Sequence, residues 1–207
     1  MNSTDTQTTL SALTLEVADP AAARAFYADA FGFDTQIDVR ATDATTTGFR
    51  GFSLSLTVAQ PANVNAYIDA AVAAGATVLK PAAKSFWGYG GVVQAPDGTI
   101  WKVATSNKKD TAPAEKKYDD LVLLLGATDV AATKRFYIEQ GMKVAKSYGR
   151  KYVEFEAGTG PVKLALYGRR ALAKDVGVPE DGSGSHRLVL GGFTATDPDG
   201  FVWEASA

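Results

Sequence analysis

The side chains with the greatest capacity for chemistry in this sequence are few and scattered. His186 is the single histidine, and Glu204 is a carboxylate 18 residues after it in the chain. The absence of cysteine excludes thiolate nucleophiles, disulfides and thiolate metal ligands. General acid–base catalysis would fall to His186, Glu204 or a tyrosine, but no spacing groups them. A Ser–His–Asp triad would need His186, and the sequence has no nucleophile-elbow motif. The catalytic residues therefore remain unassigned.

Aromatic and cationic side chains favour binding over catalysis. Phe86, Trp87 and Tyr89 lie in a Gly-rich segment, and flat side chains of this kind stack on planar ligands. The segment lacks the Lys-Ser/Thr of a phosphate-binding loop. Trp87 and Tyr89 either line a cavity or simply pack. The same alternatives hold for further side chains on expected strands: Arg40, Tyr148, Arg150, Tyr152 and Tyr167.

Composition narrows the class of protein. The 207 residues are 46% hydrophobic and 21% charged, which is typical of a globular chain with a sizeable core. The net charge is -2 and the basic residues are dispersed, whereas a nucleic-acid surface needs a basic patch. No apolar run reaches the length of a membrane span, and the first residues do not resemble a signal peptide. We therefore expect a cytoplasmic protein that binds neither nucleic acid nor membranes.

Two blocks of sequence occur twice, in the same order and at nearly the same spacing. LTLEVADPAAARAFY (13–27) matches LLLGATDVAATKRFY (123–137), and APDGTIWKVA (95–104) matches DPDGFVWEAS (197–206). This pattern indicates duplication. The polar stretch SNKKDTAPAEKK reads as a linker. The expected organisation is a disordered N-terminus (1–9), copy one (10–105), a linker (106–117) and a shorter copy two (118–207).

Each copy begins with an alternating strand and a helix. Asp19 is the expected N-cap, Pro20 suits the first helical turn, and Gly32 ends the helix. Asp129 and Gly141 take the corresponding places in copy two. The other expected elements are strands near 35–40, 52–58, 77–79, 91–94 and 100–104 with a helix near 64–72, then strands near 143–148, 152–156, 162–167, 187–190 and 201–205. The second helix is expected to be missing from copy two.

These motifs together resemble the vicinal oxygen chelate superfamily, which includes glyoxalases, bleomycin resistance proteins and extradiol dioxygenases. The resemblance covers nearly the whole chain after residue 10. The residues that carry it are Asp19, Phe26, Tyr27, Pro96, Asp97, Gly98 and Trp101, then Asp129, Phe136, Tyr137, Asp197, Pro198, Asp199, Gly200, Trp203 and Glu204. It implies an α+β fold of tandem βαβββ modules that form curved sheets, or cups, with an abbreviated second copy.

The resemblance also implies positions for metal ligands, because the family's enzymes hold a divalent metal in the cup with His, Gln and Glu. Those positions carry Ala12, Ser53 and Lys102 in copy one, and Val122, a residue near Leu164, and Glu204 in copy two. Copy one therefore offers no ligand. In one register His186 stands at a further ligand position. In the register of the internal repeat His186 matches Arg50, and the ligand position is Val189.

We therefore expect a metal-independent protein without a cofactor that binds a planar or aromatic metabolite or antibiotic in a cup. One alternative is a lyase, isomerase or dioxygenase that uses one divalent metal, held in copy two by His186 and Glu204. Another is a non-catalytic structural module. Lys102 and Glu204 are expected to face a shared or neighbouring cavity, and the chain to be a monomer or homodimer. The expected ligand-binding residues are Arg40, Trp87, Tyr89, Lys102, Tyr148, Arg150, Tyr152 and Glu204.

Overall fold

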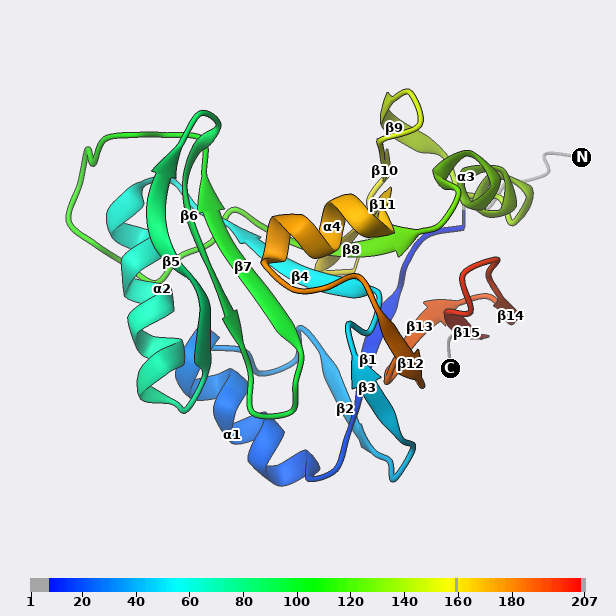
Figure 1. Ribbon diagram of the computed structural model, residues 1–207, viewed down its shortest axis with the longest axis horizontal. Helices are drawn as coiled ribbons and strands as arrows, with labels where there is room; N and C mark the ends of the chain where they lie inside the picture. The colour runs from blue at the N-terminus through cyan, green and yellow to red at the C-terminus, as the bar shows by residue number, and fades with distance from the viewer. Residues whose placement is uncertain (1–7, 159, 206–207) are drawn as a thin grey trace, which may run out of the picture.

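The computed structural model describes residues 8–158 and 160–205 (Figure 1). Residues 1–9 were predicted to be disordered, and residues 1–7 of this stretch lie outside the described residues. The elements are β1 (Ala12–Val17), α1 (Pro20–Phe31), β2 (Asp38–Ala41), β3 (Thr46–Gly48), β4 (Phe52–Thr57), α2 (Pro61–Ala73), β5 (Thr77–Ser85), β6 (Gly88–Gln94), β7 (Ile100–Thr105), β8 (Asp120–Ala127), α3 (Val130–Glu139), β9 (Val144–Tyr148), β10 (Tyr152–Phe155), β11 (Val162–Gly168), α4 (Arg169–Val176), β12 (Gly182–Gly184), β13 (Leu188–Gly192), β14 (Ala195–Thr196) and β15 (Val202–Ala205). None of the described helices is both long and apolar enough to cross a membrane.

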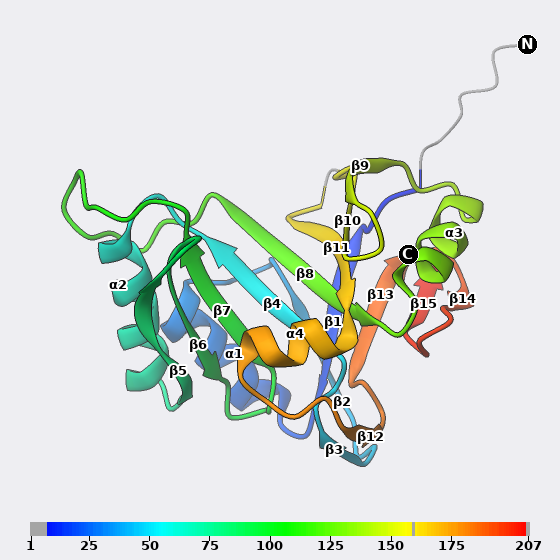
Figure 2. The ribbon, with the colours of Figure 1, turned by 45° about the horizontal axis from the view of Figure 1, so that its top comes forward.

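The large sheet has eight strands in the order β5-β6-β7-β4-β8-β11-β10-β9 (Figures 1 and 2). Its two halves are βαβββ modules of the same design. In each module the first strand pairs in parallel with the last, β4 with β7 and β8 with β11. The two first strands, β4 and β8, meet antiparallel at the centre. One module precedes the 106–117 stretch and the other follows it, so the sheet joins both repeats.

The smaller sheet has five strands in the order β14-β15-β13-β1-β2. Its central strands β1 and β13 are again antiparallel first strands, but each module is reduced. β3 leaves the sheet to pair with β12. β13 runs into β14 through residues 193–194, which are described and contain no helix. The α+β fold with curved open sheets and a shortened last module is therefore confirmed.

The helix boundaries follow from local sequence. The Asp19 carboxylate accepts hydrogen bonds from the backbone N–H groups of Ala21 and Ala22, which satisfies free donors of the first turn of α1. Gly32 ends the same helix with φ 72°, a conformation that a side chain disfavours. Asp129 caps α3 in the same way. These predictions are confirmed.

The repeated tryptophans anchor the core, as expected. Trp101 and Trp203 are fully buried, Trp101 beside the buried Tyr27 of α1 and Trp203 beside the buried Tyr137 of α3. The Tyr137 hydroxyl donates to Asp197 over 2.6 Å and accepts from the Trp203 indole N–H over 3.2 Å. Burial raises the pKa of both Tyr137 and Asp197. This polar network fixes the last hairpin against α3.

Helix α4 was not expected from the sequence, and it corrects the prediction that copy two lacks a second helix; the described residues between β13 and β15 are the part without one. Helix α4 packs against β4, β8 and β11, whereas α2 packs against β5, β6 and β7. The two helices lie on opposite faces, because Val93 belongs to the core on the α2 side while its neighbour Val92 packs with α4. A sequence signal was present, since Leu172 and Val176 lie one turn apart before Gly177, which has φ 84°.

Candidate functional site

The face of the eight-stranded sheet that carries α4 is called the cup here, and α4 fills part of it (Figures 1 and 2). The buried face of the helix consists of Leu172, Ala173 and Val176. These side chains form a second apolar cluster with the cup floor, which contributes Val92, Ile100, Leu124 and Tyr167. Helix α4 of the same chain therefore fills this part of the cup.

Cationic side chains anchor both ends of α4. Lys80 of β5 donates to the carbonyl oxygens of Lys174 at 2.8 Å and Asp175 at 2.7 Å, at the end where the helix dipole is negative. At the other end, Arg169 donates to the Phe49 carbonyl at 2.9 Å, and its guanidinium lies 5.2 Å from the centre of the Phe49 ring. The helix is held by polar contacts as well as by apolar packing.

Lys102, one of the expected ligand-binding residues, is also tied to α4. Its ammonium group lies 2.6 and 2.9 Å from the two carboxylate oxygens of Asp175. Ser53 is fully buried, and its hydroxyl has no hydrogen-bond partner in the described part of the chain. A cation and a single hydroxyl therefore occupy the two positions at which copy one would place metal ligands in the cup.

The copy-two positions in the cup offer no donors either. Val122 is apolar, and Leu164 itself packs in the core on the opposite face. Its neighbour Ala165 faces the cup, because successive strand residues alternate. The described residues contain no group of three or more His, Asp or Glu side chains that could hold a metal ion. A divalent metal does not fit this donor set.

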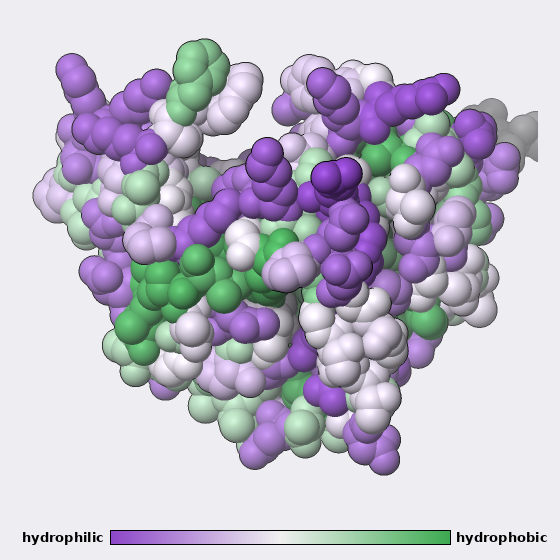
Figure 3. All heavy atoms as spheres, in the orientation of Figure 1, coloured by the Kyte–Doolittle hydropathy of each residue, from purple (hydrophilic) through white to green (hydrophobic). Residues whose placement is uncertain are grey.

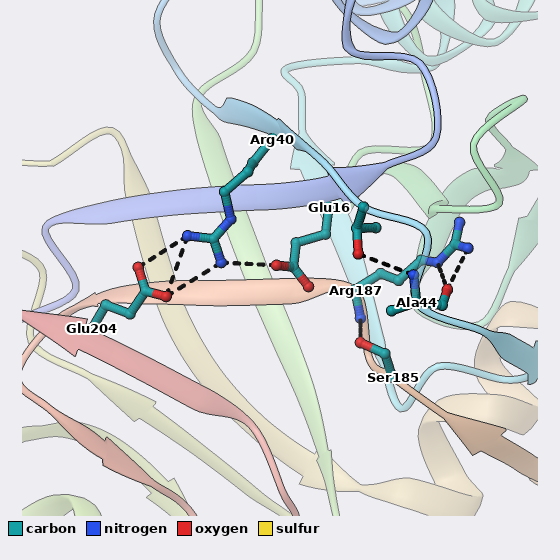
Figure 4. A network of polar contacts seen from close by, with 7 residues as sticks. Glu16, Arg40, Ala44, Ser185, Arg187 and Glu204 are labelled. Atoms are coloured by element: carbon teal, nitrogen blue, oxygen red, sulfur yellow. Dashed lines mark hydrogen bonds and ion pairs between the residues drawn. The ribbon is translucent and has the colours of Figure 1, made fainter.

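Glu204 and Arg40 meet on the smaller sheet, away from the cup. The Arg40 guanidinium lies 3.2 Å from the Glu204 carboxylate and donates to Glu16 at 2.8 Å (Figure 4). The hydrogen bond to Glu204 is the main reason that the pKa of Arg40 is raised. Lys102 and Glu204 lie on different sheets, and the hollow that Lys102 lines is not lined by Glu204. The two residues do not share that hollow, and the expectation of a shared or neighbouring cavity stays a prediction.

Both ring nitrogens of His186 contact backbone carbonyl oxygens, and the residue also borders a cavity of about 910 Å³ beside α4. Its Nδ1 lies 2.5 Å from the Arg50 carbonyl oxygen and its Nε2 lies 3.1 Å from that of Asp199, while the ring stacks on Phe201. In copy one, the Arg50 side chain donates to the carbonyl of Asp97, in the matching Pro-Asp-Gly turn. The structure therefore follows the register of the internal repeat. Glu204 of β15 pairs with Gly191 of β13, which is further along the chain than His186. His186 and Glu204 therefore do not form one group.

The open part of the cup has a hollow of about 260 Å³ on the wall formed by β5, β6 and β7. Its lining residues include Lys84, Lys102, Asp175 and Trp87. Tyr89 also belongs to the lining, but its hydroxyl donates to Asn65 of α2 at 2.9 Å, on the other face of the sheet. Tyr89 therefore packs across the sheet as well as lining the hollow, and Trp87 borders the hollow.

The other wall carries a row of tyrosines. The Tyr152 ring lies 6.0 Å from that of Tyr148 and 6.3 Å from that of Tyr167, which also contacts the α4 cluster. The Tyr152 hydroxyl donates to Glu154 over 3.1 Å. Burial, and then the charge of Glu154, raise the pKa of Tyr152, so the hydroxyl stays protonated at neutral pH. Arg150 lies exposed in the adjacent turn. The surface is hollowed between the β5–β6 and β9–β10 hairpins (Figure 3).

A curved sheet built from two βαβββ modules, with both first strands at its centre, defines the vicinal oxygen chelate fold. The comparisons with known structures agree. A V278E mutant of glyoxalase I from Zea mays is 13% identical, with a TM-score of 0.58 over 95% of this chain and 91% of that chain. Unmutated glyoxalase I from the same species is 14% identical, with a TM-score of 0.56 over 89% and 74%.

A third similar structure is a putative dioxygenase from Bacillus subtilis subsp. subtilis str. 168. It is 12% identical, with a TM-score of 0.53 over 94% of this chain and 72% of that chain. The sequence matches no protein-family model and no curated protein. These likenesses show the fold alone, so any activity has to be argued from the residues of this chain.

Proposed function

We propose that this protein binds a planar aromatic small molecule, either a metabolite or an antibiotic, in the open part of the cup and without a metal. The observation that carries the proposal is that the cup lacks metal ligands at the expected positions and has a row of tyrosines on one wall. The ligand positions hold Lys102, which is paired with Asp175, and the buried Ser53. The free wall holds the row of Tyr148, Tyr152 and Tyr167.

The tyrosine row suits a flat ligand for physical reasons. Aromatic rings offer a large contact area with few rotatable bonds, so ordering them on binding costs little entropy. Tyr148 is 66% exposed, and burying its ring under a ligand would remove apolar surface from water. Tyr152 is held between its two neighbours and by Glu154, which presets its orientation before a ligand arrives.

Tyr152→Ala is expected to weaken the binding of a planar ligand about tenfold, because one stacking contact is worth roughly 1 kcal/mol or more. A thermal-shift screen of planar aromatic metabolites and antibiotics identifies the ligand, and calorimetry then measures its dissociation constant. Tyr152→Phe keeps the ring and should retain most of the affinity. Tyr89→Phe, on the opposite face, is the matched control. No shift with any compound, or equal affinity for the Tyr152→Ala protein, would contradict the proposal.

Metal loading tests the alternative of a metal-dependent lyase, isomerase or dioxygenase. After incubation with Ni, Zn, Mn and Fe(II) and removal of the excess, we expect elemental analysis to find far less than one metal ion per chain. The reason is that Glu204 is engaged by Arg40, and both ring nitrogens of His186 face carbonyl oxygens. Stoichiometric metal that disappears in Glu204→Gln would instead establish a site in copy two.

A further inference from the structure

The hairpin between β5 and β6 ends in two exposed aromatic residues. Phe86 and Trp87 are 82% and 83% exposed, more than any other large hydrophobic side chain in the described part of the protein. Their rings meet edge to face with centres 4.9 Å apart. The hairpin tip projects from the body of the molecule (Figures 1 and 3). Such surface is costly to leave in water, and an exposed apolar tip usually marks an interaction site.

The shape of this tip limits its partner. Small molecules bind in concave sites, but Phe86 projects from a convex tip and does not line the neighbouring hollow. A stable protein interface buries about 800 Å² on each partner, which is more than two side chains at a hairpin tip provide. A lipid surface needs no complementary shape, because a small aromatic projection can enter the boundary between headgroups and acyl chains.

The charge around the tip is positive. Lys84 lies on β5 just before the tip and is exposed. Lys108, from the stretch after β7, places its ammonium group 5.8 Å from the centre of the Phe86 ring, and Lys109 follows it. The acidic neighbour Asp110 turns away, since its carboxylate accepts a hydrogen bond from the backbone N–H of Ala62 at 2.6 Å. One lysine, Lys108, therefore lies over a ring of the tip, and two more exposed lysines, Lys84 and Lys109, lie nearby in the sequence of the two segments.

We propose that this tip, formed by Phe86, Trp87, Lys84, Lys108 and Lys109, docks on an anionic lipid surface. The two rings enter the interfacial region while the lysine stems lie along it and bring their charges to anionic headgroups. The contact is peripheral and involves no membrane span. It differs from the expectation of no membrane partner, which rested on the absence of an apolar run long enough to span a membrane. The tip adjoins the proposed ligand site, because Trp87 and Lys84 border the hollow while Phe86 lies outside it.

The test uses the full chain and vesicles of phosphatidylcholine with or without phosphatidylserine. We expect the protein to sediment with the anionic vesicles, less so as salt is raised. Tryptophan emission should shift to the blue on binding. That shift reports Trp87, because the other two tryptophans, Trp101 and Trp203, are already buried. Phe86→Ser combined with Trp87→Ser should lower vesicle affinity about tenfold or more, because both rings leave the interface.

Control variants separate this contact from other effects. Val72→Ser combined with Val202→Ser removes exposed apolar side chains elsewhere and should leave vesicle binding unchanged. Replacing all three lysines by Gln should remove the preference for anionic vesicles. Tyr152→Ala should bind vesicles normally, so failure of the ligand proposal and failure of this one can be told apart. The high exposure of Phe86 and Trp87 means that their loss should not unfold the protein, which circular dichroism checks.

Three results would overturn the proposal. One is the absence of sedimentation with anionic vesicles. Another is equal sedimentation of the wild-type protein and the Phe86→Ser/Trp87→Ser protein. The third is a concentration-dependent dimer that the double substitution abolishes while vesicles are not bound, since the tip would then be a contact between copies of this chain.

Discussion

Leu172→Ala is expected to lower the free energy of unfolding by about 2–5 kcal/mol, which is the usual range for a buried Leu→Ala change. Leu172 is fully buried and lies at the centre of the apolar face that α4 presents to the cup. Its loss leaves a cavity above Val92 and Leu124 that the rigid sheet cannot close. In a chain of this length each kcal/mol corresponds to about 2–4 °C in melting temperature.

Denaturant unfolding followed by circular dichroism measures this effect. Ala171→Ser changes the exposed neighbour on the same helix and should alter stability by no more than about 0.5 kcal/mol. If Leu172→Ala cost as little as this control, α4 would not be seated in the cup in solution. The whole cup, including Ser53 and Lys102, would then be open to ligands, and the proposed function would need a larger site than the one described.

Trp203→Ala is expected to destabilise the protein by about 3–5 kcal/mol, because a large buried ring leaves the core. Trp203 stacks on Phe193 with ring centres 4.4 Å apart and donates its indole N–H to Tyr137. Tyr137 in turn donates to Asp197. Loss of the indole therefore removes both packing and one partner of a buried polar network, in which deletions are costly.

The internal repeat provides a matched comparison for the polar part of this effect. Trp101 occupies the equivalent place in copy one, but its indole N–H has no hydrogen-bond partner among the described residues. Trp203→Phe should therefore cost about 1 kcal/mol more than Trp101→Phe, which is the typical net value of one hydrogen bond. Denaturant titrations of the two single variants measure the difference. Equal losses would show that the Trp203–Tyr137 bond adds nothing to stability.

Much of the fold was predictable because its signals are local or periodic. An Asp that caps a helix acts on donors two and three residues away, so Asp19 and Asp129 mark helix starts in the sequence itself. The repeated aromatic residues identify buried positions because alternation along a strand does not depend on distant neighbours. Trp101 and Trp203 were predicted as core anchors for this reason, and both are buried.

The site depended on contacts between distant parts of the chain. Lys102 was singled out from its position, but nothing in the sequence connects it to Asp175, which α4 carries to it across the cup. Arg40 and Glu204 were both expected to bind a ligand, and only the pairing of the strands between them shows that they bind each other. The sequence allows two registers for His186, and the contact between its ring and the Asp199 carbonyl oxygen decides between them.

The sequence by itself determined the duplicated α+β fold, the caps, the buried tryptophans and the lack of metal-binding side chains at most ligand positions. Only the tertiary structure decided that one cup joins modules from both copies, that α4 occupies part of it, and that the tyrosines share one wall. The physical reason is the distance along the chain over which each interaction acts. Caps and strand alternation act over a few residues, whereas the filling of the cup depends on packing between segments that meet only after the chain has folded.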